Sequence, residues 1–274
     1  MNMSREADYG NWVPEKMMKL FWGVSGALVI ATIALLKLVK TPAAGVIAAI
    51  LAAAASTMTI YMQICRNIFD FRRGGMMGKV HQFLVEHFPW EQAVKNLGLP
   101  DGEGEILDIG CGAAALTNRC AKAFPKARFT GIDFWGSEWS YAKEQCEKNA
   151  KLEGVADRVR FEKGDAASLD FADETFDGAV SNFVFHEVKT QPEKQKVVRE
   201  ALRVVKRGGA FAFQDMFGQK ALYGDMEAFT RQLLEEGVVQ EIHYIPELEK
   251  QDFVPKFVTA PWMIYQAGLI YGIR

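Results

Sequence analysis

The order of hydrophobic and polar positions divides this chain into two unlike parts. From Leu20 to Leu36 the chain runs about 17 residues without a charge, and from Thr41 to Cys65 it does so for about 25. A bilayer-spanning helix needs about 20 apolar residues. After residue 104, short apolar runs alternate with longer amphipathic stretches. The first part predicts two long apolar helices, and the second predicts an α/β domain.

The two apolar segments are joined by a sequence that favours a tight turn. Thr41 is a typical N-cap, and Pro42 suits the first position of a second helix, where its missing N–H costs nothing. Small residues that allow close backbone approach in lipid recur every fourth position. They are Gly23, Ala27 and Ala31 in the first segment and Gly45, Ala49 and Ala53 in the second. The pattern predicts a packed transmembrane hairpin.

The basic residues around this hairpin predict its orientation. Three precede it (Arg5, Lys16, Lys19), four follow it (Arg66, Arg72, Arg73, Lys79), and the turn carries only Lys37 and Lys40. The positive-inside tendency places both ends, and the domain that follows, on the cytoplasmic side of a membrane. A cleaved signal peptide and an Ala-rich hairpin buried in an oligomer interface remain alternatives. The hairpin is also a candidate surface for homo-oligomerisation.

Turn signals then suggest a division of the whole chain. We expect an N-terminal cytoplasmic flank over residues 1–18, the hairpin over 19–64, a juxtamembrane linker with helices over 65–100, and the α/β domain over 101–274. In the linker, the stretch from Val80 to Leu97 predicts an amphipathic helix that is broken at Pro89. Pro100-Asp101-Gly102 marks the entry to the last domain.

The α/β domain is predicted to hold a doubly wound, mostly parallel sheet with helices on both faces. The expected strands are Glu105 to Ile109, Ala127 to Asp133, Arg158 to Lys163, Phe176 to Asn182 and Ala210 to Gln214, and two further strands are expected near Val238 to Tyr244 and Leu269 to Gly272. The expected helices are Ala114 to Phe124, Trp139 to Glu153, Gln191 to Lys206 and Leu222 to Glu236. Ligands of such sheets bind beyond the carboxyl ends of the strands.

Polar residues and glycines stand at those strand ends. The first strand leads into Gly110 and Gly112, which let a ligand approach the backbone at a helix N-terminus. Asp108 is a carboxylate in an otherwise apolar strand, where it needs a specific partner, and a cationic ligand would supply one. Asp133 ends the second strand, where it can accept hydrogen bonds from ribose hydroxyls. These positions predict a nucleoside-containing cofactor.

At these residues the chain resembles the class I methyltransferases that use S-adenosylmethionine. The resemblance covers roughly Glu105 to Asp215 and includes Gly164-Asp165-Ala166, the segment from Phe176 to Asn182, and the segment from Leu202 to Gly209. It implies a Rossmann-like methyltransferase fold and S-adenosylmethionine as cofactor. It also implies that Asp108, Gly110 and Gly112 hold the methionine end, Asp133 the ribose, and Asp165 and Ala166 the adenine. Phe134 is a further candidate for stacking on adenine, and Asn182 completes the expected cofactor site.

His186 and Glu187 follow the fourth strand directly and are the candidate catalytic residues. Methyl transfer needs a base only when the acceptor loses a proton, and His186 could act as that base or orient the acceptor. Glu187 could bind a cationic or hydroxyl group. Asp215, after the fifth strand, is a weaker candidate. His81, His87 and His243 have no motif context.

Composition narrows the function further. The net charge is −2, and no Lys/Arg stripe is present, which argues against nucleic acid as a partner. The 4 cysteines form no CxxC pair and predict neither a metal site nor a disulfide framework. We expect a membrane-anchored methyltransferase with a lipidic or other small-molecule acceptor. A membrane-bound cofactor-binding or assembly protein without catalysis is the alternative, and an NAD-dependent oxidoreductase is a weaker one.

Overall fold

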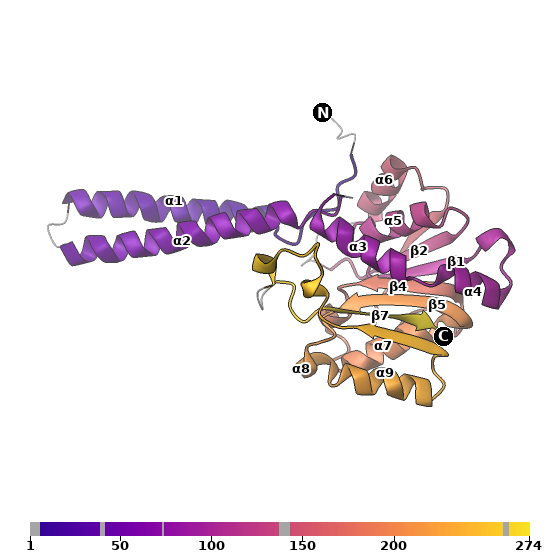
Figure 1. The fold of residues 1–274 in the computed structure, drawn as a ribbon. Coiled ribbons are helices and arrows are strands. Elements are labelled where there is room, and N and C mark those ends of the chain that lie inside the picture. The colour runs from indigo at the N-terminus through magenta and orange to yellow at the C-terminus, as the bar shows by residue number, and fades with distance from the viewer. Residues whose placement is uncertain (1–5, 39–41, 73, 137–142, 260–262) are drawn as a thin grey trace. The chain divides into compact units, whose positions relative to one another are not determined.

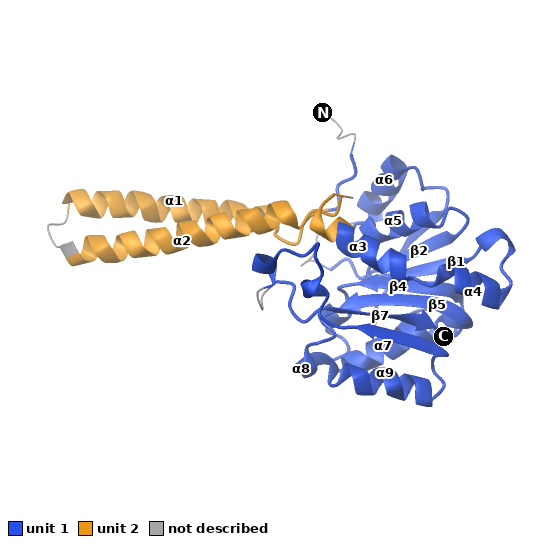
Figure 2. Cartoon of the chain, viewed as in Figure 1, with its two compact units in different colours: residues 1–9, 79–274 blue, residues 10–78 orange. Residues whose placement is uncertain are grey.

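The computed structural model describes residues 6–38, 42–72, 74–136, 143–259 and 263–274. It forms two compact units, which Figure 2 distinguishes by colour. One unit comprises residues 10–78, and the other comprises residues 1–9 together with 79–274. We describe each unit separately.

The first unit is built on two long helices, α1 (Glu15–Leu38) and α2 (Pro42–Ile68). Both are long and apolar enough to cross a membrane by length and composition. Many large apolar side chains face outward from them, and Leu20, Ile30 and Ile50 are 64%, 70% and 62% exposed. Thr41, the expected N-cap, lies outside the described residues, and Pro42 is the first residue of α2. The two predicted helices are therefore present.

The contact between α1 and α2 follows a seven-residue spacing. Met18, Ser25 and Thr32 are buried in α1, and Gly45, Ala52 and Thr59 are buried in α2. Ser25 Oγ and Thr59 Oγ1 lie 2.7 Å apart across this seven-residue seam, within hydrogen-bond distance. Two helices packed at a shallow angle touch at every 3.5 residues, which produces this spacing.

The prediction that the stripes of small residues form the interface between the two helices is therefore largely wrong. Gly23, Ala27 and Ala31 are exposed, and so are Ala49 and Ala53. Residues at a strict four-residue spacing drift around a helix that has 3.6 residues per turn, so the stripe leaves the contact face. Gly45 alone of the six is buried, and a Cβ added there would lie 2.5 Å from Leu36 Cδ2.

The second unit holds a seven-stranded sheet of order β3-β2-β1-β4-β5-β7-β6. The strands are β1 (Glu105–Ile109), β2 (Arg128–Asp133), β3 (Val159–Lys163), β4 (Phe176–Asn182), β5 (Val205–Asp215), β6 (Glu241–Ile245) and β7 (Gly268–Ile273). The first five pair in parallel, and β7 is antiparallel to both β5 and β6. The mostly parallel, doubly wound sheet predicted from the sequence is confirmed.

Helices cover both faces of this sheet, as Figure 1 shows for α5 and α6 on one side and α7 and α9 on the other. The helices of this unit include α3 (Met76–His87, whose first residues belong to the other unit), α4 (Trp90–Leu97), α5 (Ala115–Ala123), α6 (Lys143–Glu153), α7 (Lys194–Arg203), α8 (Lys220–Tyr223) and α9 (Met226–Glu235). Two buried apolar clusters result. The first joins α3, α4, α5 and α6 to one face, and the second joins α7 and α9 to the other.

The observed elements differ from the predicted ones in a few places. The helix expected from Leu222 to Glu236 is two helices, because Gly224 has a positive φ of 66° and Asp225 caps α9 by accepting from Ala228 N. The helix expected from Trp139 is described only from Lys143. The break predicted at Pro89 is confirmed, since α3 ends at His87 and α4 begins at Trp90.

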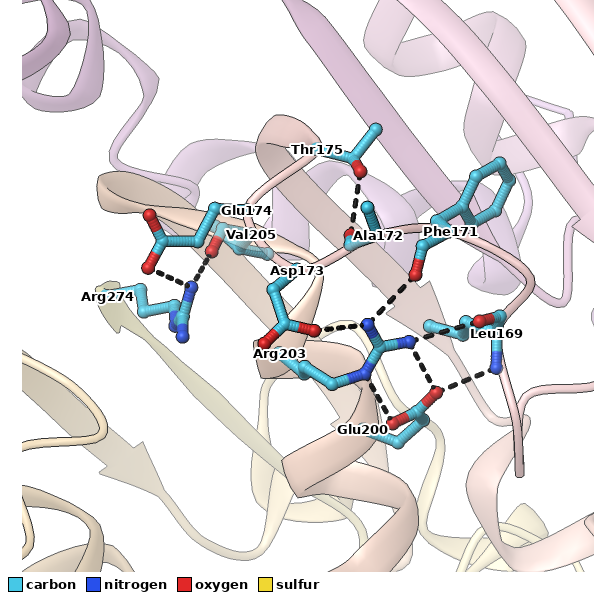
Figure 3. A network of polar contacts seen from close by, with 10 residues as sticks. All are labelled: Leu169, Phe171, Ala172, Asp173, Glu174, Thr175, Glu200, Arg203, Val205 and Arg274. Carbon is cyan, nitrogen blue, oxygen red and sulfur yellow. Dashed lines mark hydrogen bonds and ion pairs between the residues drawn. The ribbon is translucent and has the colours of Figure 1, made fainter.

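An arginine-centred network secures the loop that leads into β4 (Figure 3). Arg203 donates to the Leu169 and Phe171 carbonyls and to the carboxylates of Asp173 and Glu200. Glu200 in turn accepts from Leu169 N at 2.7 Å. The end of α7 is thereby tied to the loop between β3 and β4.

Candidate functional site

The predicted site residues gather at the carboxyl ends of the parallel strands. The loop after β1 starts with Gly110 and Gly112, whose φ values of 74° and 56° lie in the left-handed region that favours glycine. A Cβ added at Gly110 would lie 2.2 Å from Val184 Cγ2, so only glycine fits beside the loop that follows β4. The loops after β1 and β4 therefore meet at this edge, as the two neighbouring parallel strands require.

Asp108 lies in β1, 1% exposed, with one carboxyl oxygen engaged and one open. Thr117 of α5 donates to Oδ2 at 2.5 Å, while Oδ1 has no hydrogen-bond partner among the described residues. Burial raises the pKa of Asp108 to about 7, against the opposing effect of the Thr117 hydrogen bond. A buried carboxyl oxygen without a donor is costly. A cationic or N–H-bearing ligand group would satisfy it, which is the property expected of this residue from the sequence.

Asp133, at the end of β2, connects two loops of the site. Its Oδ2 accepts from Gly112 N at 2.9 Å, and its Oδ1 accepts from Trp135 N at 2.8 Å. Phe134 between them is 57% exposed, with the Lys163 ammonium 5.4 Å from its ring centroid. The Asp133 carboxylate thus holds the glycine loop in place, and the Phe134 ring beside it is more than half exposed.

Asp165 and Ala166 follow β3 at the same edge. Asp165 Oδ1 accepts from Ala167 N at 2.9 Å, which closes a short turn around Ala166. Thr190 Oγ1 donates to Asp165 Oδ2 at 2.9 Å. The Asp165 side chain therefore shapes this loop.

His186 forms a buried ion pair with Asp215 across the ends of β4 and β5. His186 Nδ1 lies 2.8 Å from Asp215 Oδ1, and its Nε2 lies 3.3 Å from Glu187 Oε1. Burial opposes the charged imidazolium, but the Asp215 carboxylate outweighs it, and with the help of Glu187 it raises the pKa of His186 to about 10. Asp215 has no exposed side-chain surface, and the His186 charge holds its pKa below its usual range although burial opposes this.

At neutral pH His186 is therefore protonated and both ring nitrogens donate. The Asp215 carboxylate of this ion pair is also held by two backbone groups, Phe185 N and Met216 N, which donate to it at 2.8 and 2.6 Å. An imidazolium in this state orients and donates hydrogen bonds, and it must lose its proton before it can act as a base. Asp215, the weaker candidate of the sequence analysis, is the residue that determines this state.

Asn182, at the end of β4, has a neighbour that no sequence signal singled out. Its Nδ2 lies 3.1 Å from His81 Nε2 of α3, and its Oδ1 is buried without a hydrogen-bond partner among the described residues. His81 is 2% exposed. Burial, with the nearby Arg119 charge, lowers the pKa of His81 to about 3, so its ring is neutral. A histidine on an amphipathic helix far upstream carries no motif, which is why only the fold places it here.

Comparison with known proteins identifies this domain. Residues 107–213 match the family described as "Methyltransferase domain", a stretch that begins within β1 and ends within β5. Similar proteins include an arsenite methyltransferase of Aquipseudomonas alcaligenes, 31% identical over 44% of this chain and 35% of that protein. A sterol 24-C-methyltransferase of Gibberella zeae is 30% identical over 52% of this chain and 35% of its own length.

A third relative is matched over more of its length. The 2-phytyl-1,4-naphtoquinone methyltransferase of Thermosynechococcus vestitus is 27% identical over 66% of this chain and 79% of its own. The chain thus spans little more than a third of the first two relatives and most of the third. The matched segment, the sheet order and the glycine loop agree, and residues 107–213 form a class I S-adenosylmethionine-dependent methyltransferase domain.

Proposed function

We propose that this protein transfers a methyl group from S-adenosylmethionine to a lipidic or membrane-partitioned acceptor, and that its helical hairpin anchors it to a membrane. The observation that carries the proposed activity is the open Oδ1 of buried Asp108 beside the two positive-φ glycines. In the proposal, Asp108 accepts from the cofactor's ammonium group, Asp133 from its ribose hydroxyls, and Phe134 stacks on its adenine. Asp165 and Ala166 border the adenine, and Asn182 lies beside the methionine end.

When bound, S-adenosylmethionine supplies a methyl group already activated on a sulfonium. Once the acceptor has taken up this methyl group, S-adenosylhomocysteine would be the second product. The protein has to align the two partners and exclude water. We assign His186 to orientation of the acceptor, because its raised pKa keeps it an imidazolium at neutral pH. Asp215 holds its Nδ1–H, and the acceptor would share its Nε2–H with Glu187. Glu187, 3.3 Å from His186 Nε2, steadies that imidazolium.

The membrane part of the proposal rests on the surface of the hairpin. Its two helices expose apolar side chains along their length, with mean hydropathies of 1.9 and 2.0, and that surface suits lipid far better than water. Two of the relatives reported above are named for a sterol and a phytyl-naphthoquinone, both membrane-partitioned molecules. An acceptor dissolved in the bilayer would reach an enzyme anchored there without crossing water.

A turnover assay tests the activity. Purified protein in detergent is incubated with methyl-labelled S-adenosylmethionine and a total membrane lipid extract, and label in the lipid phase is counted. We expect incorporation by the wild type and a loss of at least tenfold in Asp108→Asn and in His186→Ala. Calorimetry with S-adenosylhomocysteine separates the roles, since His186→Ala keeps its binding and Asp108→Asn weakens it. Binding without incorporation would favour the non-catalytic alternative.

An alkaline carbonate wash of membranes from expressing cells tests the anchor. Integral proteins stay with the lipid when peripheral contacts are broken by high pH. We expect the full chain to remain in the pellet. Release into the supernatant would contradict the proposed anchor and would leave the oligomer-interface alternative for the hairpin.

A further inference from the structure

A group of buried polar atoms, one of them in Asn182 of the expected cofactor site, lies beneath α3. Gln214 of β5 is 0% exposed, and neither its Nε2 nor its Oε1 has a hydrogen-bond partner among the described residues. Asn182 Oδ1 is likewise buried and unsatisfied. Buried amides are nearly always hydrogen-bonded, because each unmade bond costs free energy. Three open amide atoms in one place therefore need an explanation.

The sheet register shows that these atoms share one face. Asn182 and Gln214 are direct partners in the parallel β4–β5 ladder, and Gln214 is opposite Leu269 of β7. Partners across a ladder point to the same side of the sheet. Leu269 belongs to the apolar cluster that includes Leu84 and Phe88, at and just after the end of the helix that carries His81. His81, Asn182 and Gln214 thus form a polar group at the strand ends, beneath α3.

The side chains of this polar group are uncharged, and together they offer both a hydrogen-bond donor and hydrogen-bond acceptors. Gln214 offers an N–H donor and a carbonyl acceptor, Asn182 offers a carbonyl acceptor, and the Asn182 amide occupies His81 Nε2. None of the three carries a charge, since the buried His81 ring is neutral. A bare cation or a phosphate would be left without a counter-charge from these three side chains. A hydroxyl or carbonyl group on an apolar skeleton matches both the donor and the acceptors.

We propose that Gln214 and Asn182, backed by His81, form the subsite that binds an uncharged hydroxyl- or carbonyl-bearing head group of the methyl acceptor. This inference rests on the proposed function and names the chemical class of its substrate. The position fits that role. Asn182 is the last residue of β4, the strand next to β1, and Gln214 is the last but one of β5 beyond it. Both lie on the face that Asp108 shares through its register with Val180. Gln214 touches the acceptor in this scheme, and His81 is a positioning residue for Asn182.

The test compares Gln214→Leu with a matched control, Ser181→Ala. Ser181 is also buried, one residue before Asn182, but its Oγ is satisfied by donating to the Ile109 carbonyl at 2.8 Å. Replacing an unsatisfied amide by an apolar side chain of similar size removes a cost, whereas removing a made hydrogen bond adds one. Thermal unfolding, S-adenosylhomocysteine binding and the apparent KM for a total membrane lipid extract in micelles are measured for both variants.

For Gln214→Leu we expect an unchanged or higher unfolding temperature, unchanged S-adenosylhomocysteine affinity and at least a tenfold rise in the apparent KM for the extract. Ser181→Ala should unfold at a lower temperature with the KM unchanged. An unchanged KM in Gln214→Leu would overturn the proposal. So would a fall in its unfolding temperature as large as that of Ser181→Ala, which would mean that an ordered water satisfies the amide.

The labelled lipid product tests the proposed class directly. Mass spectrometry should identify an uncharged oxygen-bearing head group, and a methylated amine or phosphate-bearing lipid would contradict the inference while leaving the methyltransferase activity intact. If the wild type binds S-adenosylhomocysteine but labels nothing in the extract, the proposed function itself fails. For the positioning role, His81→Gln should raise the KM for the extract with little change in kcat, and an unchanged KM would exclude it.

Discussion

Asp108 shows how burial prepares a single side chain for a ligand. Its carboxyl group is 1% exposed, accepts one hydrogen bond from Thr117 and has a pKa raised by burial to about 7. Near neutral pH the free protein therefore holds this group partly protonated. A bound ammonium group would favour the ionised form, so ligand binding and proton release at this residue are coupled.

This coupling predicts a pH dependence of cofactor-product binding. Below about pH 7 the folded protein must release a proton from Asp108 before it pairs with the ligand's ammonium. The affinity for S-adenosylhomocysteine should then fall towards tenfold for each pH unit below 7 and level off above it. Calorimetry between pH 5.5 and 8.5 measures this, with Asp108→Asn as the comparison. Parallel profiles in the two proteins would show that another group is responsible.

Ala114 is a residue in a conformation that suits glycine better. It precedes α5 with φ 68° and ψ 27°, in the left-handed region, and is fully buried. Holding an L-residue in this conformation destabilises the folded state by about 1 to 2 kcal/mol. Glycine avoids that strain, but its greater freedom in the unfolded chain costs about 0.4 to 1 kcal/mol of stability. We therefore expect Ala114→Gly to raise the free energy of unfolding slightly. Ala115→Gly, in the first turn of α5, should lower it, and the same sign for both would contradict this explanation.

At the scale of elements, the two-helix unit depends on which helix faces meet. The seven-residue seam buries Ser25, Thr59 and Gly45, while Gly23 faces outward with nothing within 4 Å of an added Cβ. In lipid, helix association depends on close packing and on interhelical hydrogen bonds, such as the one between Ser25 and Thr59. The seam and not the count of small residues therefore determines the stability of the hairpin.

A pair of glycine substitutions tests the seam. Gly45→Leu should force α1 and α2 apart, because a Cβ at this position already lies 2.5 Å from Leu36 Cδ2. Gly23→Leu should leave the pairing unchanged, since its side chain would point away from the partner helix. The free energy of detergent-induced unfolding of the full chain in micelles reports both. An equal loss of unfolding free energy in the two variants would contradict the assignment of the seam as the helix interface.

At the scale of the whole molecule, the proposed membrane insertion makes a prediction about topology. All 4 native cysteines are buried, so a single introduced cysteine can be labelled selectively. With both ends of the hairpin cytoplasmic, Leu38→Cys, at a position 81% exposed in the folded chain, should react with an impermeant maleimide on intact cells. Asp101→Cys, which is exposed just before β1, should react only after permeabilisation. The reverse pattern would invert the orientation.

The sequence alone determined what depends on local pattern. Charge-free stretches specified two long helices, and the alternation of apolar runs specified a mostly parallel sheet. The two glycines after Asp108 predicted a loop, and both have positive φ values. These features follow from periodicity and backbone conformation, which neighbouring residues set among themselves. The seam of the hairpin was missed, because which face of a helix is buried depends on its partner.

Only the tertiary structure decided which distant residues meet. It placed Asp215 against His186, which sets the protonation of that histidine, and it brought His81 and Asn182 together although 101 positions separate them. It also left the Gln214 amide open in a buried site. Burial and contact between remote residues set ionisation and hydrogen bonding, and these quantities come into existence only when the sheet and its covering helices have assembled.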